Sequence, residues 1–255
     1  MIRINQPRSS RHSATVPDSS TATPACLSVL NSYSASASLY TAAIDAAGYL
    51  PDTSRRAAVR TSHTMVTLYS IEDLAEARRI ADTAVCDAQH GSSVAIRARA
   101  YAVQAEIAAR TGEAAHADSA LRRAWKAVTS HAVDDPFGGF DPSRLAGFEG
   151  VCQLHTGKAD QAHQLLDRTY TALNRPRDQV QRGIVTADLA LTRLRLDDPQ
   201  SCVTLLHESV DIVAATGGRV SAQRIRHVRR ELTPWRTETF MAELGDHIHD
   251  ALIGR

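Results

Sequence analysis

The feature that most constrains this chain is a succession of helix-length segments, each with an apolar stripe. From about Leu39 onward, apolar residues recur at helical spacing, and alternating runs of β-branched residues are almost absent. Proline and glycine interrupt this pattern, and the segments between them are about 14 to 20 residues long. The pattern predicts an all-α protein.

Because the breaks between segments are short, neighbouring helices are expected to pack antiparallel. The segments form four predicted hairpins and two further helices: 55–70 with 73–89, 93–111 with 114–130, 143–156 with 159–174, 178–195 with 199–215, then 219–232 and 236–253. Residues 1–30 are rich in Ser, Pro and Arg, with Asp18 as the only acid, and predict a disordered arm. The same composition also fits an organelle transit peptide. We therefore divide the chain into this arm, a capping helix within 31–54, the hairpins of 55–216 and terminal helices in 217–255.

Small residues recur at one position of the hairpins. In each hairpin, the second helix has a small residue near its start and another small residue seven positions later. These pairs are Ala77 and Ala84, Ala117 and Ala124, Ala162 and Thr169, and Cys202 and Ser209. The first of each pair recurs after 40, 45 and 40 residues. Small side chains on one face let two helices approach closely, which predicts an array in which each hairpin buries its face against the next.

Two of these units resemble a known family. The stretches ARTGEAAHADSALRRAWKAV and LHTGKADQAHQLLDRTYTAL resemble the Gly-to-Ala-to-Ala core of tetratricopeptide repeats, with IEDLAEARRIADTAV and LDDPQSCVTLLHESV as degenerate copies. The period is longer than the usual length of about 34 residues, and the early aromatic of the repeat is mostly missing. The resemblance implies a right-handed superhelical solenoid with a ligand-binding groove.

The end of the chain extends the resemblance. With the basic segment RVSAQRIRHVRREL before TPW, the chain resembles the C-terminal sensory half of bacterial helix-turn-helix regulators. This likeness implies transcriptional control of secondary-metabolism or antibiotic-resistance genes. Residues 1–54 contain no recognisable DNA-reading half, so a truncated remnant of a longer regulator is an alternative.

The composition limits which kinds of partner the protein is expected to bind. A net charge of +1 gives no overall attraction to DNA or to anionic lipid. There is no long apolar run and no signal peptide, which predicts a cytoplasmic protein without a membrane partner. The four cysteines, Cys26, Cys86, Cys152 and Cys202, lie far apart and are expected to be reduced thiols. We expect no cofactor.

Enzyme motifs are mostly missing. The chain has no phosphate loop and no nucleophile elbow, and Pro136 interrupts the acidic run around Asp134 and Asp135. His207 and Asp211 share a helix face with Glu208 between them, which leaves a helical metal-dependent enzyme as the alternative function. Polar residues on a repeat helix explain the same pattern. We expect no catalytic or metal-binding residues and a regulatory protein that is not an enzyme.

The resemblance also assigns a groove. First-helix residues line the groove in tetratricopeptide repeats, and the matching positions here are His63, Arg99, Glu106, Arg110, Arg144, Phe148, Asp188 and Arg195. A groove with several arginines beside an aromatic ring suits an acidic peptide or a carboxylate-bearing signal. The expected partner is therefore a peptide, a protein or a small signal, and a homodimer through an open terminal repeat stays an alternative.

The segment 219–232 is the most basic part of the chain. Its candidate patch for nucleic acid or an acidic partner comprises Arg219, Arg226, Arg229 and Arg230. The competing interpretation is a solvated face, or pairing with the acidic last helix, which carries Glu238, Glu243, Asp246 and Asp250. DNA contact is expected only through a partner or through this helix.

If this helix contacts DNA phosphates, the variants Arg226→Ala and Arg230→Ala weaken binding almost equally on all sequences. They also flatten its salt dependence, because fewer counterions are released. Fluorescence anisotropy on the gene's own upstream DNA and on a scrambled duplex measures both effects. An unchanged affinity removes this route to DNA.

Overall fold

A computed structural model describes residues 38–130, 135, 137 and 139–252. The predicted arm of residues 1–30 lies outside the described residues. By its internal contacts the chain divides into Met1–Ser38 and a compact unit, Leu39–Arg255. The predicted repeats and terminal helices thus belong to one unit. Its described residues form helices and contain no β-strand, so the prediction of an all-α protein is confirmed.

Residues 38–48 are helical, and ten further α-helices follow them in the described part of the chain. Their bounds are α2 Ser54–Val66, α3 Leu74–His90, α4 Val94–Arg110, α5 Ala114–Thr129, α6 Pro142–His155, α7 Ala159–Ala172, α8 Gln179–Arg195, α9 Pro199–Thr216, α10 Arg219–Glu231 and α11 Thr239–Leu252. Three short elements accompany them: the π-helix η2 Thr67–Ile71 and the 3₁₀ turns η3 Pro176–Asp178 and η4 Thr233–Trp235.

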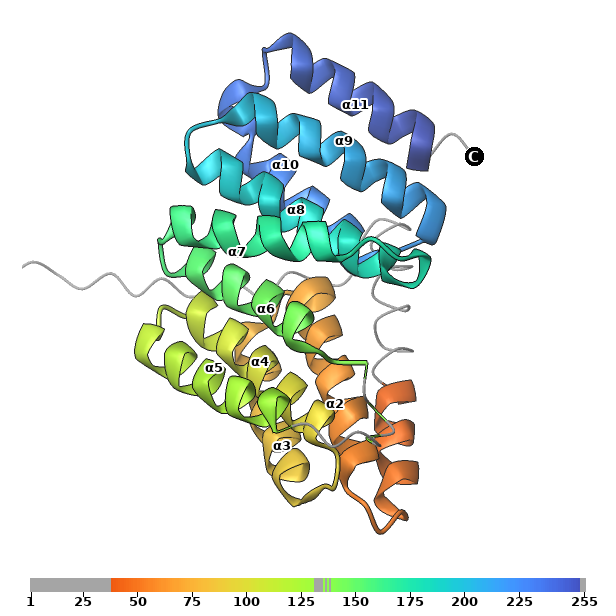
Figure 1. Cartoon of the computed structure of the whole chain (residues 1–255). Helices are drawn as coiled ribbons and strands as arrows, with labels where there is room; N and C mark the ends of the chain where they lie inside the picture. The colour runs from red at the N-terminus through yellow and green to blue at the C-terminus, as the bar shows by residue number, and fades with distance from the viewer. Residues whose placement is uncertain (1–37, 131–134, 136, 138, 253–255) are drawn as a thin grey trace, which may run out of the picture. The chain divides into compact units, whose positions relative to one another are not determined.

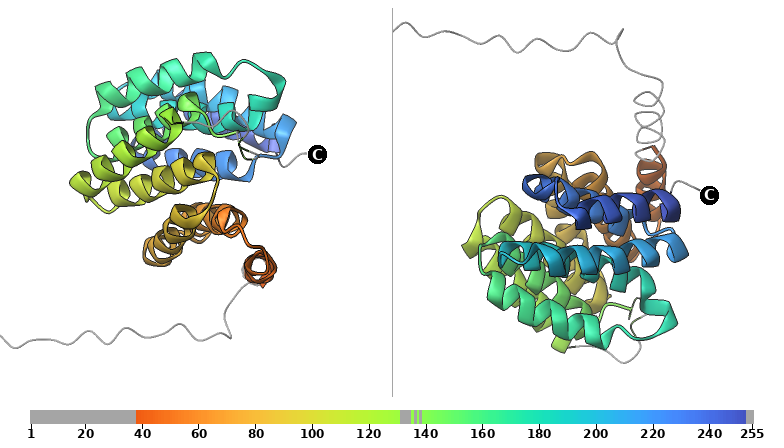
Figure 2. Two further views of the ribbon diagram at one scale, coloured as in Figure 1. Left: turned by 60° about the horizontal axis from the view of Figure 1, so that its bottom comes forward. Right: turned by 90° about the horizontal axis from the view of Figure 1, so that it is seen from above.

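The helices pair as hairpins. The most extensive contacts join α2 to α3, α4 to α5, α6 to α7 and α8 to α9, and Figure 1 shows each pair side by side. Successive hairpins then pack through α3 with α4, α4 with α6, and α7 with α8. Figure 2 shows the same succession of helices in two further views. Each hairpin therefore buries its apolar stripe mainly against its neighbours.

The first small residue of each hairpin lies at these contacts. Ala77, Ala117, Ala162 and Cys202 are at most 1% exposed, and the second small residues are nearly as buried. A larger side chain at such a position has no free space, because helix interfaces are packed at the density of a crystal. Side-chain size at this position thus controls how closely the hairpins approach.

The repeat is also visible in the backbone. Every hairpin turns through one residue with positive φ, five positions before the first small residue: Glu72, Gly112, Gly157 and Asp197. The sequence suggested this only for the two glycines. In the last three hairpins the next amide donates to the carbonyl five residues earlier, at 2.8 to 3.0 Å, which ends the first helix in a Schellman-type turn.

The first hairpin has one residue more in its turn. The Asp73 amide donates to the carbonyl of Thr67, six residues earlier, at 3.3 Å. The additional residue is accommodated by the π-helix η2, because a π turn widens each hydrogen-bonded ring by one residue. The prediction of one regular helix over 55–70 is therefore wrong in its last turn, and the displaced side chain is Tyr69.

The terminal helices differ in what they contact. Helix α11 packs on α9, whereas α10 packs on α8 and α9 and also reaches η2 of the first hairpin. The contact with η2 includes Val220, which packs against the apolar cluster that contains Leu68 and Tyr69. Helix α10 thus joins the last hairpin to the first.

Two further expectations concern the whole chain. None of the helices in the described part of the chain is both long and apolar enough to span a membrane. Cys86, Cys152 and Cys202 are free thiols, whereas Cys26 lies outside the described residues. Burial raises the pKa of Cys202 to about 12, so this thiol is protonated and unreactive at neutral pH.

The packing predicts a large difference between two alanines of α5. Ala117 is 1% exposed at the hairpin contact, whereas Ala115 is exposed on the same helix. We expect Ala117→Leu to lower the free energy of unfolding by roughly 1–3 kcal/mol through overpacking. Urea denaturation measures the change, with Ala115→Leu as the control. Equal stability of the two variants would contradict this account of the hairpin contacts.

Candidate functional site

Basic side chains line up at the ends of successive first helices. Arg110, His155 and Arg195 each lie two residues before the positive-φ residue of their hairpin, in the last turn of α4, α6 and α8. Cations are favoured there because the free carbonyls of a helix C-terminus carry partial negative charge. The repeat therefore places three basic groups in a row.

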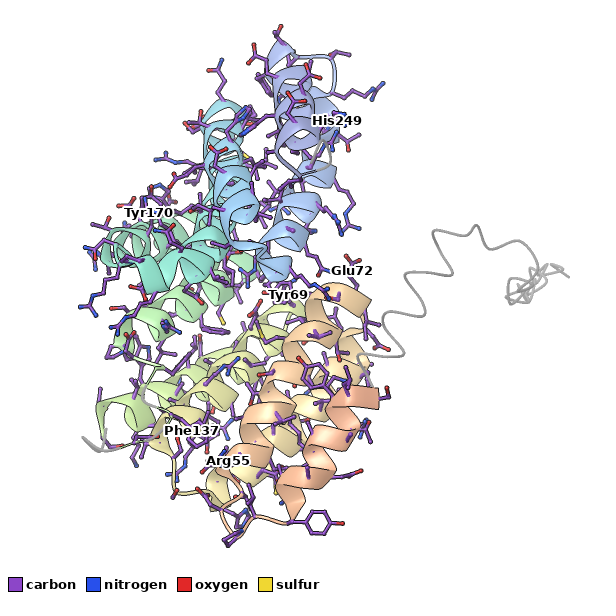
Figure 3. The ribbon with its side chains drawn as sticks, turned by 90° about the vertical axis from the view of Figure 1, so that its right-hand side faces the viewer. Arg55, Tyr69, Glu72, Phe137, Tyr170 and His249 are labelled. Atoms are coloured by element: carbon purple, nitrogen blue, oxygen red, sulfur yellow. The ribbon has the colours of Figure 1, made fainter. Side chains whose placement is uncertain are left out.

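These three residues line a charged cleft of about 380 Å³. Its other walls come from the first hairpin, through Tyr69 and Glu72, and from α10. Figure 3 shows Tyr69 and Glu72 where the first hairpin meets the C-terminal helices. Leu68, Leu74, Leu191 and Val228 add apolar surface. The cleft thus combines cationic groups with an apolar wall, as small-molecule sites commonly do.

The inner wall of the cleft continues into a largely buried set of polar groups that we call the Arg224 network: Tyr69, Glu106, Arg110, Asp188 and Arg224. The Glu106 side chain is 0% exposed, and those of Arg224 and Asp188 are 6% and 8% exposed. Arg224 donates to Asp188 and to the Tyr69 hydroxyl, and its Nη2 lies 3.6 Å from Glu106. Arg110 donates to Glu106 through Nε at 3.1 Å and Nη2 at 3.0 Å. Two carboxylates therefore face two guanidinium groups.

The Tyr69 hydroxyl is bonded to three of the four charged side chains of this network. Its hydroxyl donates to Glu106 and accepts from Arg224 and, at 2.8 Å, from Arg110. One donor and two acceptor sites are all that a phenol has, so this hydroxyl is saturated. Burial lowers the pKa of Arg224 to about 10, against the opposing effect of Glu106, and the group is still protonated at neutral pH.

Two buried atoms of the network have no hydrogen-bond partner among the described residues: Oε2 of Glu106 and Nε of Arg224. The π-helix and the positive φ of Glu72 lie at the same corner. Unsatisfied polar atoms and unusual backbone both cost free energy, and they concentrate at functional sites. This corner is therefore the strongest functional candidate in the described part of the chain.

The rim of the cleft is held by exposed ion pairs. Arg195 bonds to Glu231 at 3.1 Å, and Arg230 bonds to Glu72 at 3.0 Å. Exposed pairs of this kind contribute little to stability. A ligand that enters the cleft can therefore break these ion pairs with little loss of stability.

The histidines report the electrostatic potential of the cleft. The pKa of His155 is lowered to about 3, first by burial and then by the positive charges of Arg110 and Arg224 and by His227 and Arg195. Burial also lowers the pKa of His227, and the positive charges of Arg110, Arg230 and Arg195 add to the shift against the opposing effect of Glu231. Both imidazoles are neutral at pH 7, in surroundings that disfavour a further positive charge. The same surroundings favour an anion.

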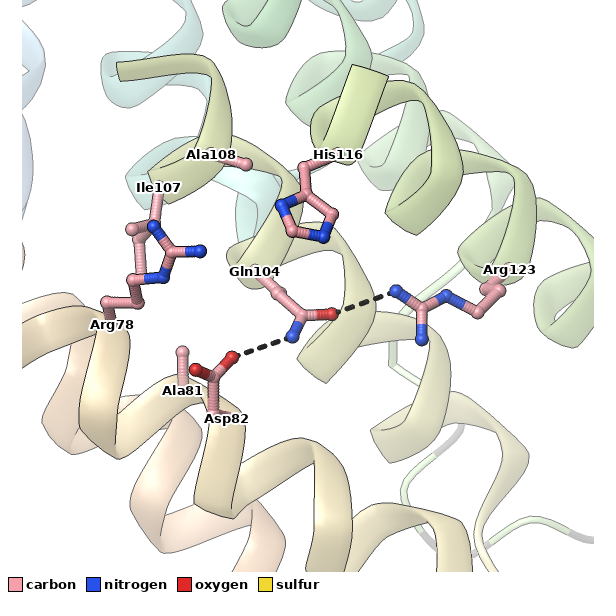
Figure 4. Close-up of a pocket in the computed structure, with 8 residues that line it drawn as sticks. All are labelled: Arg78, Ala81, Asp82, Gln104, Ile107, Ala108, His116 and Arg123. Carbon is pink, nitrogen blue, oxygen red and sulfur yellow. Dashed lines mark hydrogen bonds between the residues drawn. The ribbon is translucent and has the colours of Figure 1, made fainter. Parts of the chain in front are cut away.

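A second cavity, of about 220 Å³, lies between α3, α4 and α5 (Figure 4). Its polar groups already have partners: Gln104 donates to Asp82 at 2.8 Å, and Arg123 donates to Gln104 at 3.3 Å. Arg78 is bonded to Glu113, which also holds His116. Because these groups satisfy one another, this cavity is a weaker candidate than the charged cleft.

The structure brings together half of the predicted groove residues. Arg110, Asp188 and Arg195 line the cleft, and Glu106 lies in the adjoining network. Phe148 lines a smaller adjoining pocket with Asp188 and Arg224. The other three predicted residues do not line the cleft. His63 stacks on Tyr40 at 4.7 Å, and Arg144 pairs with Asp178 at 3.6 Å. The pKa of Arg99 is lowered by burial and by the like charge of Arg144.

Sequence reasoning missed His155, Tyr69 and Arg224. His155 occupies the same repeat position as Arg110 and Arg195, so that position would have identified it. Arg224 lies beside Ile225 and one helical turn before Val228, on the buried face of α10, although it was counted with the basic segment. Only the π-helix places Tyr69, and no pattern in the sequence signals it.

The predicted basic patch is present on the surface. Arg219, Arg226, Arg229 and Arg230 are exposed. Their predicted alternative, pairing with the acidic last helix, is wrong for the described residues, because Arg230 pairs with Glu72 and no ion pair joins α10 to α11. The reason is that α11 packs on α9 instead.

His207 and Asp211 do not converge on a common point. Both contact His247 of α11: His207 Nδ1 lies 2.6 Å from His247 Nδ1, and Asp211 Oδ1 lies 2.9 Å from His247 Nε2. They therefore lie at opposite ends of one imidazole ring. Glu208, which lies between them in the sequence, is bonded to Tyr170 and Arg182. In the described part of the chain no three His, Cys, Asp or Glu side chains gather as metal ligands do.

No protein-family model matches the chain, and no curated protein or solved structure is significantly similar to it.

The depressed pKa of His155 predicts an acid-dependent stability. In the unfolded chain this histidine titrates near 6.5, and in the folded protein near 3. The unfolded state therefore binds the proton first as the pH falls. The stabilisation is complete above about pH 6.5 and is lost as the pH falls toward 3, at no more than about 1.4 kcal/mol per pH unit.

Thermal unfolding between pH 7 and pH 4 tests this prediction. His155→Gln is expected to flatten the acid side of the profile, and His249→Gln, at an exposed position of α11, is the control that should leave it unchanged. An identical acid slope in wild type and His155→Gln would show that His155 is not held neutral by its surroundings.

Proposed function

We propose that this protein is a non-enzymatic regulatory protein that binds a carboxylate-bearing ligand, either an acidic peptide or a small signal, in the charged cleft. The observation that carries the proposal is the row of Arg110, His155 and Arg195 on three successive hairpins. A tetratricopeptide-like arrangement of the hairpins, with the row facing its groove, belongs to the same proposal.

The chemistry of the cleft favours a carboxylate over a neutral group. Arginine offers a planar fork that binds both carboxylate oxygens, and histidine becomes a second donor when it gains a proton. Burial is the main cause of the low pKa of His155, and the neighbouring positive charges add to it. An anion beside His155 offsets these charges, so carboxylate binding is expected to raise the pKa of this group.

The size and apolar wall of the cleft limit the rest of the ligand. A volume of about 380 Å³ lies at the lower end of the range for small-molecule sites. Leu68, Leu74 and Leu191 come from the first hairpin and α8, so an apolar chain extends across the cleft from the carboxylate. A short aliphatic acid or one acidic side chain of a peptide fits this description.

Binding can regulate because the cleft is built from distant parts of the chain. Its walls come from the first hairpin, α4, α6, α8 and α10, so a ligand that contacts them all favours the arrangement in which they are close. We place this binding in transcriptional control because of the resemblance to sensory regions of bacterial regulators. Contact with DNA would then be made by a partner or by the exposed arginines of α10.

Isothermal titration calorimetry with octanoate and its neutral analogue octanamide tests the binding proposal. We expect octanoate to bind and octanamide to bind more weakly. Arg195→Gln is expected to weaken octanoate binding by roughly tenfold, because a hydrogen bond to a charged group is lost.

The matched control is Arg193→Gln on the same helix. Arg193 lies 3.8 Å from Asp198 and does not line the cleft, so octanoate affinity should not change. A peptide ending in Leu-Glu, compared with a Leu-Gln peptide amidated at its C-terminus, extends the test to acidic peptides. If neither octanoate nor the acidic peptide binds the wild-type protein, the proposal is wrong.

A further inference from the structure

The Arg224 network contains a site that is separate from its occupant. Its acceptors belong to three hairpins: Tyr69 lies in η2, Glu106 in α4 and Asp188 in α8. The guanidinium that they bind comes from α10, 155 residues away from Tyr69 along the chain. The acceptors are thus part of the repeats, and the cation comes from the helix that follows them.

We propose that Tyr69, Glu106 and Asp188 form a binding site for a guanidinium group, which Arg224 occupies as a tethered ligand and which a free guanidinium compound or an arginine side chain of a partner can occupy in its place. This inference does not depend on the carboxylate ligand of the cleft.

The geometry suits a guanidinium better than an ammonium group. Arg224 directs Nη1 to Asp188 and Nη2 to the Tyr69 hydroxyl and toward Glu106, so its acceptors lie on different edges of one plane. Its Cζ also lies 4.5 Å from the centre of the Tyr69 ring. A planar fork can reach these acceptors together, whereas an ammonium presents three hydrogens from one point.

The charges require a cation in this site. Without Arg224, the buried carboxylates Glu106 and Asp188 would share Arg110 alone, and a buried charge without a partner is strongly unfavourable. Arg110 donates to Glu106 but has no hydrogen bond to Asp188. The repeats therefore retain an affinity for a second cation whether or not α10 supplies it.

The connection between α10 and the preceding hairpin contains two glycines. Helix α10 follows Gly217 and Gly218, and Gly217 has a φ of 67°. Besides Arg224, its polar link to the first hairpin is the exposed pair between Arg230 and Glu72. Rotation about the glycines would withdraw Arg224 from the acceptors of all three hairpins, at the cost of the contacts that bury Ile225 and Val228. Exchange of Arg224 for another guanidinium would then release α10 from the first hairpin and open the charged cleft on one side.

Chemical rescue of Arg224→Ala tests the site. The variant leaves a cavity beside two carboxylates, and we expect its melting temperature to fall by roughly 10 °C. Millimolar methylguanidinium chloride should restore at least half of this loss in a saturable manner. Methylammonium chloride and sodium chloride at equal ionic strength should not, and Arg226→Ala, at an exposed position of α10, should show neither loss nor rescue.

A second measurement needs no variant, in case Arg224→Ala does not fold. Hydrogen exchange of the wild-type protein is compared in methylguanidinium and methylammonium at concentrations that leave the melting temperature unchanged. Faster exchange in 219–231 with methylguanidinium alone supports the proposal. Equal exchange in both salts, or rescue of Arg224→Ala by methylammonium as well, overturns it.

A third experiment distinguishes a free guanidinium compound from an arginine side chain as the ligand. Acetyl-arginine amide and acetyl-lysine amide are added to Arg224→Ala in place of methylguanidinium. Rescue by the arginine compound shows that the site accepts an arginine side chain and so the arginine of a partner. Rescue by methylguanidinium alone limits the site to small free guanidinium compounds. Since octanoate is absent throughout, the result is independent of the carboxylate proposal.

Discussion

Two buried carboxylates, Glu106 and Asp188, impose the constraint on which the arrangement of this protein depends. Both are buried, and a buried carboxylate is stabilised by a cation in contact. Arg110 serves Glu106 from its own helix, one turn away, but Asp188 is reached by Arg224 of α10. The same Arg224 guanidinium also donates to the Tyr69 hydroxyl, and this bond joins the end of the chain to its first hairpin. A hydrophobic contact alone would not specify this, because many helix faces of this chain are equally apolar.

The contact of α10 with the first hairpin differs from the other helix contacts, because those join hairpins that are neighbours in the sequence. Each hairpin packs mainly on the next, and an array with neighbour contacts only can bend at every interface. Helix α10 adds contacts with α8, α9 and η2, so it joins the first hairpin to the last. The joint is made of one buried arginine, one exposed ion pair and the side chain of Val220. Few groups therefore control whether the two ends of the hairpin series stay together.

Most of the fold could be predicted from the sequence because it follows from local patterns. Apolar periodicity and breakers located the helices, and the small residues from Ala77 to Cys202 located their contacts. The turns were harder: Gly112 and Gly157 were visible, but Glu72 and Asp197 adopt the same positive φ without a glycine. Half of the predicted groove residues lie at one cleft because the repeat fixes their position. Tyr69 and Arg224 could not be identified in this way. The position of Tyr69 depends on a single additional residue in a turn, and that of Arg224 depends on a partner 155 residues away.

The same helix neutralises the buried acids and forms a wall of the cleft, and this couples the two sites. Arg224 contributes to the positive potential that keeps His155 neutral, so a cleft without Arg224 attracts an anion less strongly. A carboxylate in the cleft conversely stabilises the guanidinium groups around it, and with them the attachment of α10. A guanidinium compound that displaces Arg224 and a carboxylate that enters the cleft thus act on one equilibrium, the attachment of α10 to the first hairpin. Linkage requires this coupling to be reciprocal: whatever the displacing compound does to carboxylate affinity, the carboxylate does to the affinity of that compound.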